Sequence, residues 1–228
     1  MQPVARVLAW IAGALLGTGA FAQDWESWDI GDPSPGPFDD NAGTWTIEAN
    51  GADIWAAADA FRFTYQETDG DFDLSARIVS FTDVHEWSKV GLMARQSLDA
   101  GTPNVFVNLT GTHGVKVIHR DTVGGPTGPD PAEPNAEAPV YLRLVREGDL
   151  FTSYLSDDGA AWDLAEIAGA PAEVTLALGD PVFVGVGVTS HIAGTLMTAE
   201  IDSVQGSFLP VEPLGKVAAT WAALKASR

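Results

Sequence analysis

The 228-residue sequence contains no cysteine. The chain therefore has no disulfide framework, no thiol nucleophile and no cysteine-ligated zinc site. It is also poor in basic residues: 12 Lys and Arg stand against 31 Asp and Glu, for a formal net charge of −19. Because nucleic acids and anionic membranes carry charge of the same sign, the sequence argues against both as partners.

Long hydrophobic runs are absent beyond the N-terminus. There, Arg6 precedes the apolar stretch Val7–Leu16, and Ala20-Phe21-Ala22 has the small-residue pattern of a cleavage site. This arrangement is typical of a secretory signal peptide and is too short for a comfortable membrane span. We therefore expect residues 1–22 to be removed and the mature chain to be secreted, either extracellular or periplasmic, without membrane insertion after cleavage.

The remaining chain is dominated by apolar residues that alternate with polar ones, as Phe61, Phe63 and Tyr65 do. Strands are predicted at 44–48, 60–66, 70–80, 105–109, 115–118, 140–145, 150–155, 181–189 and 196–204. Clusters of Gly, Asp, Asn and Pro separate these runs, which is typical of antiparallel strands joined by hairpins. We therefore predict an all-β sandwich of two antiparallel sheets sharing one core.

Three segments depart from this pattern. Asp32–Asn41 is rich in Pro and Asp and is predicted to be irregular. Asp121–Ala138 carries four prolines and three glycines, which is typical of either a functional rim or a disordered loop. The tail, residues 209–228, contains Gly215–Ser227 with high helix propensity. We expect a short helix there, either docked on the sandwich or serving as an attachment segment.

A set of short motifs occurs in a recognisable order. They are Gly51–Trp55, Asp59–Tyr65, Gly70–Arg77, Lys89–Ser97, Arg143–Gly148, Ser156–Trp162, Val184–Val188 and Glu200–Val204. Together they resemble the secreted bacterial concanavalin A-like jelly rolls related to the "regulation of enolase protein" family, whose function is largely unknown. The resemblance covers roughly residues 23–208 and implies a lectin/glucanase-type jelly-roll sandwich of the kind often found beside carbohydrate-active modules. It supplies no catalytic residues.

One sequence element bears on hydrolysis. Glucanases of this fold class resemble one another through a Glu-x-Asp-x-x-Glu strand, and the stretch that begins at Glu200 comes close but ends in Gln205. Retaining hydrolysis requires two carboxyl groups, one of which donates a proton, and a glutamine cannot do so. We therefore expect the protein not to be an enzyme.

Metal binding is left open by the sequence. Asp69, Asp71 and Asp73 alternate, but the EF-hand glycine and glutamate are missing, so a solvated strand face explains them better. The Asp32–Asn41 loop collects oxygen ligands, which makes calcium a hypothesis, and no other cofactor is implied.

Candidate ligand-binding residues are aromatic or positively charged. Trp87 lies in a polar stretch beside His85, and Trp55 follows Asp53, so these two rings look least like core residues. Arginines predicted on strands need either carboxylate partners or an anionic ligand. The predicted site residues are Trp55, Asp53, Trp87, His85, Arg95, Arg120 and Arg143.

These expectations favour a secreted, non-catalytic module that binds a polysaccharide or glycoconjugate on a concave sheet face. The alternatives are a structural or adhesion module of the cell exterior and, least favoured, a polysaccharide-active enzyme.

Overall fold

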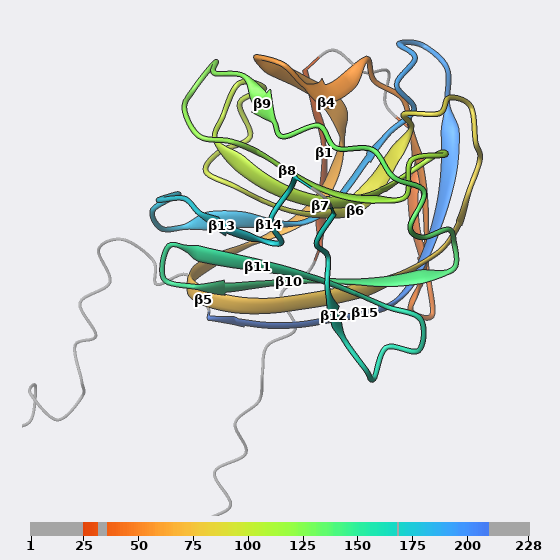
Figure 1. Ribbon diagram of the computed structural model, residues 1–228. Helices are drawn as coiled ribbons and strands as arrows, with labels where there is room; N and C mark the ends of the chain where they lie inside the picture. The colour runs from red at the N-terminus through yellow and green to blue at the C-terminus, as the bar shows by residue number, and fades with distance from the viewer. Residues whose placement is uncertain (1–24, 32–35, 168, 210–228) are drawn as a thin grey trace, which may run out of the picture.

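The computed structural model describes residues 25–31, 36–167 and 169–209, and within them every regular element is a strand (Figure 1). The all-β prediction is therefore confirmed. The predicted signal peptide and tail helix lie outside the described residues. No helix in the described part of the chain is long and apolar enough to cross a membrane.

The strands form two layers. Sheet A has the order β1-β5-β14-β6-β7-β8-β9, from β1 (Glu26–Ile30), β5 (Ala58–Phe81), β14 (Val182–Thr189), β6 (Lys89–Arg95), β7 (Asn104–Thr110), β8 (Val115–Arg120) and β9 (Thr127–Gly128). Sheet B has the order β2-β3-β15-β5-β10-β11, from β2 (Phe38–Asn41), β3 (Thr44–Ala49), β15 (Met197–Leu209), β10 (Val140–Glu147) and β11 (Leu150–Ser156). β12 (Asp163–Leu164) and β13 (Glu173–Thr175) both pair with β11, while β4 (Asp53–Trp55) pairs with the start of β5. All of these pairings are antiparallel.

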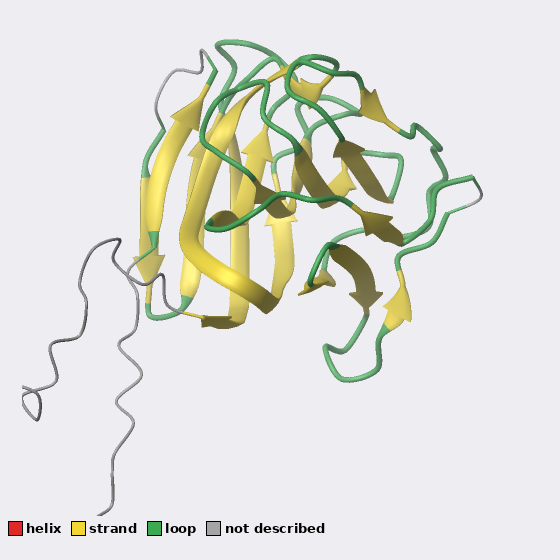
Figure 2. Ribbon diagram, turned by 90° about the vertical axis from the view of Figure 1, so that its left-hand side faces the viewer, coloured by secondary structure: helices red, strands yellow, loops and turns green. Residues whose placement is uncertain are grey.

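β5 belongs to both sheets. Its first half pairs with β1 and β14 in sheet A, and its second half pairs with β10 and β15 in sheet B (Figure 2). The sequence predicted two separate strands here, 60–66 and 70–80, because the apolar alternation lapses between them. Gly70 does adopt a left-handed φ of 68°, but pairing continues on both sides of it, from Thr68 with β14 and from Asp69 with β15. A single 24-residue strand is the result.

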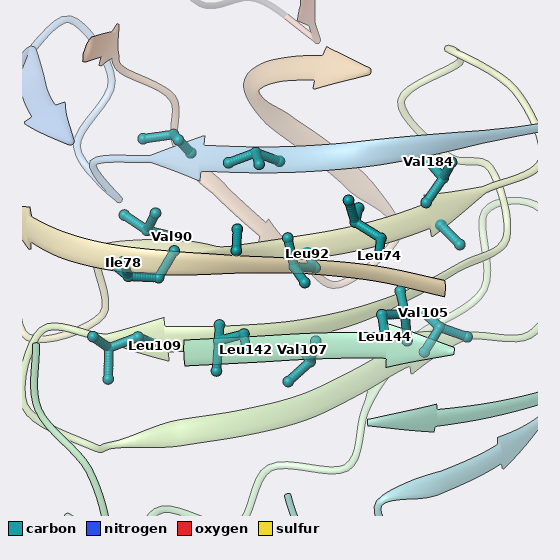
Figure 3. Close-up of a cluster of buried hydrophobic side chains, with 14 of the residues drawn as sticks. Leu74, Ile78, Val90, Leu92, Val105, Val107, Leu109, Leu142, Leu144 and Val184 are labelled. Atoms are coloured by element: carbon teal, nitrogen blue, oxygen red, sulfur yellow. The ribbon is translucent and has the colours of Figure 1, made fainter. Parts of the chain in front are cut away.

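The main core lies between the two sheets. Figure 3 shows Leu74, Ile78, Leu142 and Leu144 of sheet B meeting aliphatic side chains of sheet A, and all are buried. The sheet A contributors that it labels are Val90, Leu92, Val105, Val107, Leu109 and Val184. The alternation that predicted a shared core is therefore confirmed.

A second, smaller core covers the outer face of sheet A, which is the face turned away from sheet B. Its buried members are Ile30, Ile54, Phe61, Phe63, Tyr65, Met93, Phe106 and Ile118. Ile54 comes from β4, whose hairpin with β5 folds back over this face. Polar side chains on the same face are consequently shielded from solvent, and the candidate site lies among them.

One of the two described segments that the sequence predicted to be loops differs from expectation. Residues Phe38–Asn41 form β2 rather than an irregular loop, because they pair with β3 and Asp40 accepts a hydrogen bond from the Gly43 amide at 2.9 Å, closing the turn. The segment Asp121–Ala138 lies along β8. It contributes β9, and the Asn135 side chain accepts a hydrogen bond from the Val115 amide at 2.8 Å.

Candidate functional site

A pocket of about 260 Å³ opens on the outer face of sheet A. It is lined by Asp53, Trp55, Trp87, Lys89, Lys116, Ile118, Asp130 and His191. We call it the outer-face pocket. Its walls come from segments far apart in the chain, namely β4, the start of β6, β8, the loop after β9 and the turn after β14.

β4 supplies one wall. Asp53 and Trp55 are two residues apart on this strand, so they point to the same side, while Ile54 between them enters the second core. Trp55 packs against that core and also lines the pocket. The strand ends in a tight turn at Ala56, whose φ is 51°. The Asp53-x-Trp55 spacing therefore delivers a carboxylate and a half-buried indole ring to one surface.

The Lys89 ammonium lies deep in the pocket. Its side chain is only 4% exposed, and it forms an ion pair with Asp53 and donates a hydrogen bond to the Trp87 carbonyl at 3.3 Å. Burial lowers the pKa of Lys89 below its ordinary value; Asp53 opposes this shift, and the positive charge of Lys116 adds to it. The two lysines therefore lie close enough to influence each other electrostatically.

Lys116 is the second buried cation. Its side chain is 2% exposed, it forms an ion pair with Asp130, and its Nζ lies 4.3 Å from the centroid of the Trp87 ring. The His113 ring stacks on Trp87 with a centroid separation of 3.7 Å, which fills one face of the indole. Lys116 must therefore lie over the opposite face. Both faces of the Trp87 ring are therefore occupied by protein side chains. Trp55 is the ring of this pocket that can contact a ligand.

Two further histidines lie at the pocket margin. His191 lines the pocket, and its Nδ1 lies 3.2 Å from the Asp53 carboxylate. His85 stacks on His191 with a centroid separation of 4.3 Å, and its Nδ1 accepts a hydrogen bond from the Trp87 amide at 3.1 Å. His85, a predicted site residue, thus supports His191 and Trp87 from behind the lining.

Arg95 and Arg120, also predicted as ligand-binding residues, lie in the interior instead. Both converge on Asp59, and none of the three side chains is exposed. Arg120 also donates to the carbonyl oxygens of Trp55 and Ala56, at 3.3 and 3.2 Å. Of the two alternatives for these arginines, a carboxylate partner or an anionic ligand, the structure has the carboxylate partner. Arg120 also holds the turn that follows Trp55.

Arg143 is placed on sheet B, away from the outer-face pocket. It donates two hydrogen bonds to Asp73, at 2.8 and 2.6 Å, and lies 5.6 Å from the Trp162 ring. These residues border a separate open groove of about 450 Å³. The structure therefore brings Asp53, Trp55 and Trp87 together in one pocket, with His85 behind them, and leaves the three arginines elsewhere.

Sequence reasoning missed the residues that give the pocket its charge. These are Lys89, Lys116, Asp130 and His191. Alternation in the strand Val115–Ile118 directs Lys116 away from the shared core, toward a face that the sequence gives no reason to regard as covered. The approach of Asp130 and His191 depends on loop paths that alternation does not encode.

The acidic motifs singled out in the sequence lie outside this pocket. Asp71 accepts a hydrogen bond from the Gly148 amide at 2.7 Å, and Asp73 pairs with Arg143. Among the described residues, no group of three or more His, Asp or Glu side chains is arranged to hold a metal ion. Asp32 lies outside the described residues, so the calcium hypothesis for its loop stays a prediction.

By sequence, the chain matches no protein-family model and no curated protein. By structure, it is similar to a functionally unknown protein from Saccharomyces cerevisiae, with a TM-score of 0.63 and 16% identity over 82% of this chain and 97% of that one. It is also similar to the GH43 protein BlXynB from Bacillus licheniformis (TM-score 0.56, 15% identity), of which it spans 33% while 73% of this chain is covered. Lectin I-B4 from Griffonia simplicifolia aligns with a TM-score of 0.48 and 8% identity over 84% of this chain and 95% of that one. The two likenesses with TM-scores above 0.5 concern the fold alone, and together with the antiparallel strand pairings they confirm the predicted two-sheet β-sandwich.

Proposed function

We propose that this protein is a non-catalytic glycan-binding module and that the outer-face pocket holds one sugar unit. The observation that carries the proposal is the lining of the pocket: the Trp55 indole stands beside two ammonium–carboxylate pairs, Lys89–Asp53 and Lys116–Asp130. An indole face packs against the C–H face of a sugar ring. Each charge pair offers donors and acceptors to adjacent hydroxyl groups.

The size of the pocket supports a single sugar rather than a buried chain. Sites for drug-sized ligands occupy roughly 300–1,000 Å³, and the outer-face pocket, at about 260 Å³, lies just below this range. A terminal or single internal residue of a polysaccharide would enter it, while the rest of the chain stays outside. Extracellular polysaccharides fit the predicted export of the protein.

The arrangement of acidic side chains supports binding without cleavage. Glu200 and Asp202 of the glucanase-like stretch lie on β15, where they contact Ser80 and Arg77 at 3.1 and 3.4 Å. The two carboxylates of the pocket pair with different lysines. A retaining glycosidase needs two carboxyl groups about 5–5.5 Å apart across the scissile bond, one of them protonated, and the pocket offers two lysine-paired carboxylates instead.

Affinity electrophoresis of the secreted protein in native gels tests the proposal. Gels contain a panel of neutral and acidic polysaccharides, with and without calcium or a chelator. We expect at least one polysaccharide to retard the protein, and Trp55→Ala to abolish the retardation while circular dichroism shows an unchanged fold. Trp162→Ala, in the groove on sheet B, serves as the matched control and should retain binding.

Each remaining outcome has a defined meaning. Retardation by no polysaccharide would refute the proposal and favour a structural or adhesion module. Retardation that survives Trp55→Ala would place the site elsewhere. Release of reducing ends from a retarding polysaccharide would refute the non-catalytic assignment.

A further inference from the structure

The outer-face pocket buries two ammonium groups, which a site for a neutral sugar does not require. The chain has four lysines, Lys89, Lys116, Lys216 and Lys225. The two that the structure describes both place their ammonium groups in this pocket, with side chains 4% and 2% exposed. Lysine is almost never fully buried, since removing its charge from water costs several kcal/mol. Two buried lysines in one small pocket therefore call for a ligand that uses them.

The lysines and aspartates of the pocket also differ in how deeply they are buried, and this difference supports an anionic ligand. The lysines lie innermost, whereas their partners are more accessible: the Asp53 side chain is 21% exposed and that of Asp130 is 55% exposed. Asp130 lies on the loop that follows β9, so its ion pair with Lys116 is the one that an incoming group can replace at least cost. An anionic group entering the pocket would meet the ammonium charges at its base.

Counting donors leaves room for such a group. An ammonium group has three N–H donors. Among the described residues, Lys89 donates to Asp53 and to the Trp87 carbonyl, and Lys116 donates to Asp130 and faces the Trp87 ring. Each lysine therefore keeps one N–H for a ligand. A carboxylate has two acceptor oxygens, which suits one donor from each lysine.

The net charge of the protein does not oppose this chemistry at short range. The acidic surface repels anions over long distances, but the Debye length is about 8 Å at physiological ionic strength. Inside the pocket an entering carboxylate meets the two lysines together with their partners Asp53 and Asp130, and the more exposed Asp130 is the partner that it would displace. Desolvated pairs are screened much less than surface charges.

We propose that the outer-face pocket recognises the carboxylate of a uronic acid unit in an acidic polysaccharide, with Lys89 and Lys116 as the carboxylate-binding residues and Trp55 against the sugar ring. This inference rests on the proposed glycan-binding function and names its ligand class. A simple carboxylate lacks the ring that Trp55 contacts, and a neutral sugar lacks the group that the lysines contact.

Isothermal titration calorimetry with matched ligands tests the inference. The probes are a galacturonic acid oligomer, a galactose oligomer of the same length and linkage, and sodium acetate, each titrated into the full secreted protein at physiological salt. We expect the uronic acid oligomer to bind at least about tenfold more tightly than its neutral counterpart, because charged hydrogen bonds are lost in the latter. Acetate alone should bind too weakly to measure.

Two variants separate ligand binding from folding. Lys116→Met should reduce the affinity for the uronic acid oligomer by at least about tenfold and the affinity for the neutral oligomer much less, because the neutral sugar offers Lys116 only hydroxyl groups. Asp130→Asn removes the competing carboxylate from Lys116 and should tighten binding of the uronic acid oligomer, a gain that structural damage would not produce. Arg143→Met, on sheet B, removes a positive charge outside the pocket and should leave affinity unchanged.

The outcomes distinguish the inference from the function on which it rests. Equal affinity for the two oligomers, or retention of uronic acid binding in Lys116→Met, would overturn the uronic acid assignment and leave glycan binding intact. If acetate bound as tightly as the uronic acid oligomer, the pocket would be a general carboxylate site and the uronic acid assignment would be wrong. Binding of neither oligomer, together with no retardation by any polysaccharide in the gel panel, would overturn both proposals.

Discussion

Arg120 and Asp59 form a two-point ion pair in which neither side chain is exposed to solvent. The Arg120 Nη2 and Nη1 atoms donate to the two oxygens of the carboxylate at 2.5 and 2.9 Å. The same guanidinium donates to the backbone carbonyls of Trp55 and Ala56, where β4 ends and the turn begins. The pair thus connects the interior of sheet A to the Trp55 wall of the outer-face pocket.

Replacing Arg120 tests whether this arginine supports the fold or contacts the ligand. Arg120→Met leaves the Asp59 carboxylate buried with a weaker partner, so we expect the free energy of unfolding to fall by about 3–5 kcal/mol. Arg120→Lys should lower the free energy of unfolding by nearly as much, because lysine cannot make the two-point contact with the carboxylate. Denaturation by urea, monitored by circular dichroism, measures both.

Arg143→Met provides the control for this measurement. Arg143 is also paired with a carboxylate, but its side chain is 30% exposed and that of Asp73 is 39% exposed. Loss of the Arg143–Asp73 ion pair should lower the free energy of unfolding by about 1 kcal/mol or less. If Arg120→Met were as stable as the original protein and lost glycan binding, Arg120 would contact the ligand directly, contrary to its position in the structure.

We expect the buried Lys89–Asp53 ion pair to contribute little net free energy of folding compared with uncharged side chains in the same place, and to be needed for ligand binding. Asp53→Asn removes the charge that compensates a buried ammonium group, so we expect a loss of about 3 kcal/mol. In the double variant Asp53→Asn/Lys89→Met the uncompensated charge is also gone. Because apolar side chains often replace buried ion pairs without loss, the double variant should regain most of the lost stability.

Equilibrium unfolding of the two variants checks this expectation, with ligand titration alongside. The double variant, which lacks the Lys89 ammonium, should bind the uronic acid oligomer more weakly than Asp53→Asn, which keeps it. A double variant no more stable than Asp53→Asn would contradict the assignment of the cost to the buried ammonium.

The sequence predicted the layers of the fold better than the charges of the site. Alternation located the strands because each buries one face, and it placed Leu74 and Leu142 in the shared core. It also singled out Asp53, Trp55 and Trp87, which the structure brings to one pocket. It did not predict that β5 is continuous, since residues 67–69 are polar and carry no apolar alternation.

The lysines escaped prediction for a different physical reason. A lysine on a strand is ordinarily directed to solvent, and only the fold shows that the outer face of sheet A is covered by the β4 hairpin. Asp130 and His191 reach the pocket through loops whose paths depend on tertiary contacts rather than on local pattern. The aromatic half of the site was therefore predictable, and its charged half was not.

Tyr65 gives a prediction about alkaline pH. Burial and the hydrogen bond that its hydroxyl donates to Glu26 raise the pKa of Tyr65 to about 12. In the unfolded chain the pKa is about 10, so between these values the unfolded state loses a proton that the folded state keeps. Stability should therefore fall as the pH rises from about 10 toward 12.

The ultraviolet difference spectrum of tyrosinate measures this titration directly. The chain has three tyrosines, and we expect the step that belongs to Tyr65 near pH 12. Tyr65→Phe should remove this step and make stability less sensitive to pH above 10. An unchanged step in that variant would assign it to another tyrosine.

Gly91 tests how closely β6 and β7 must approach beneath the outer-face pocket. A Cβ atom at this position would overlap the Val107 carbonyl oxygen and the Asn108 Cα, both backbone atoms of β7. They cannot move without disturbing the β6–β7 ladder, in which Gly91 is the partner of Asn108. We expect Gly91→Ala to destabilise the protein by about 3 kcal/mol, the upper part of the range for overpacking.

Gly187 is the matched control, since it lies beside Gly91 on the neighbouring strand β14. A Cβ atom there would meet ring carbons of Phe61 and Phe106 at 3.2–3.4 Å, and these side chains can shift by a few tenths of an ångström. Gly187→Ala should therefore cost less than Gly91→Ala when the two are compared by thermal unfolding. Equal costs would indicate that rearrangement of the rings, rather than backbone proximity, limits packing on this face of sheet A.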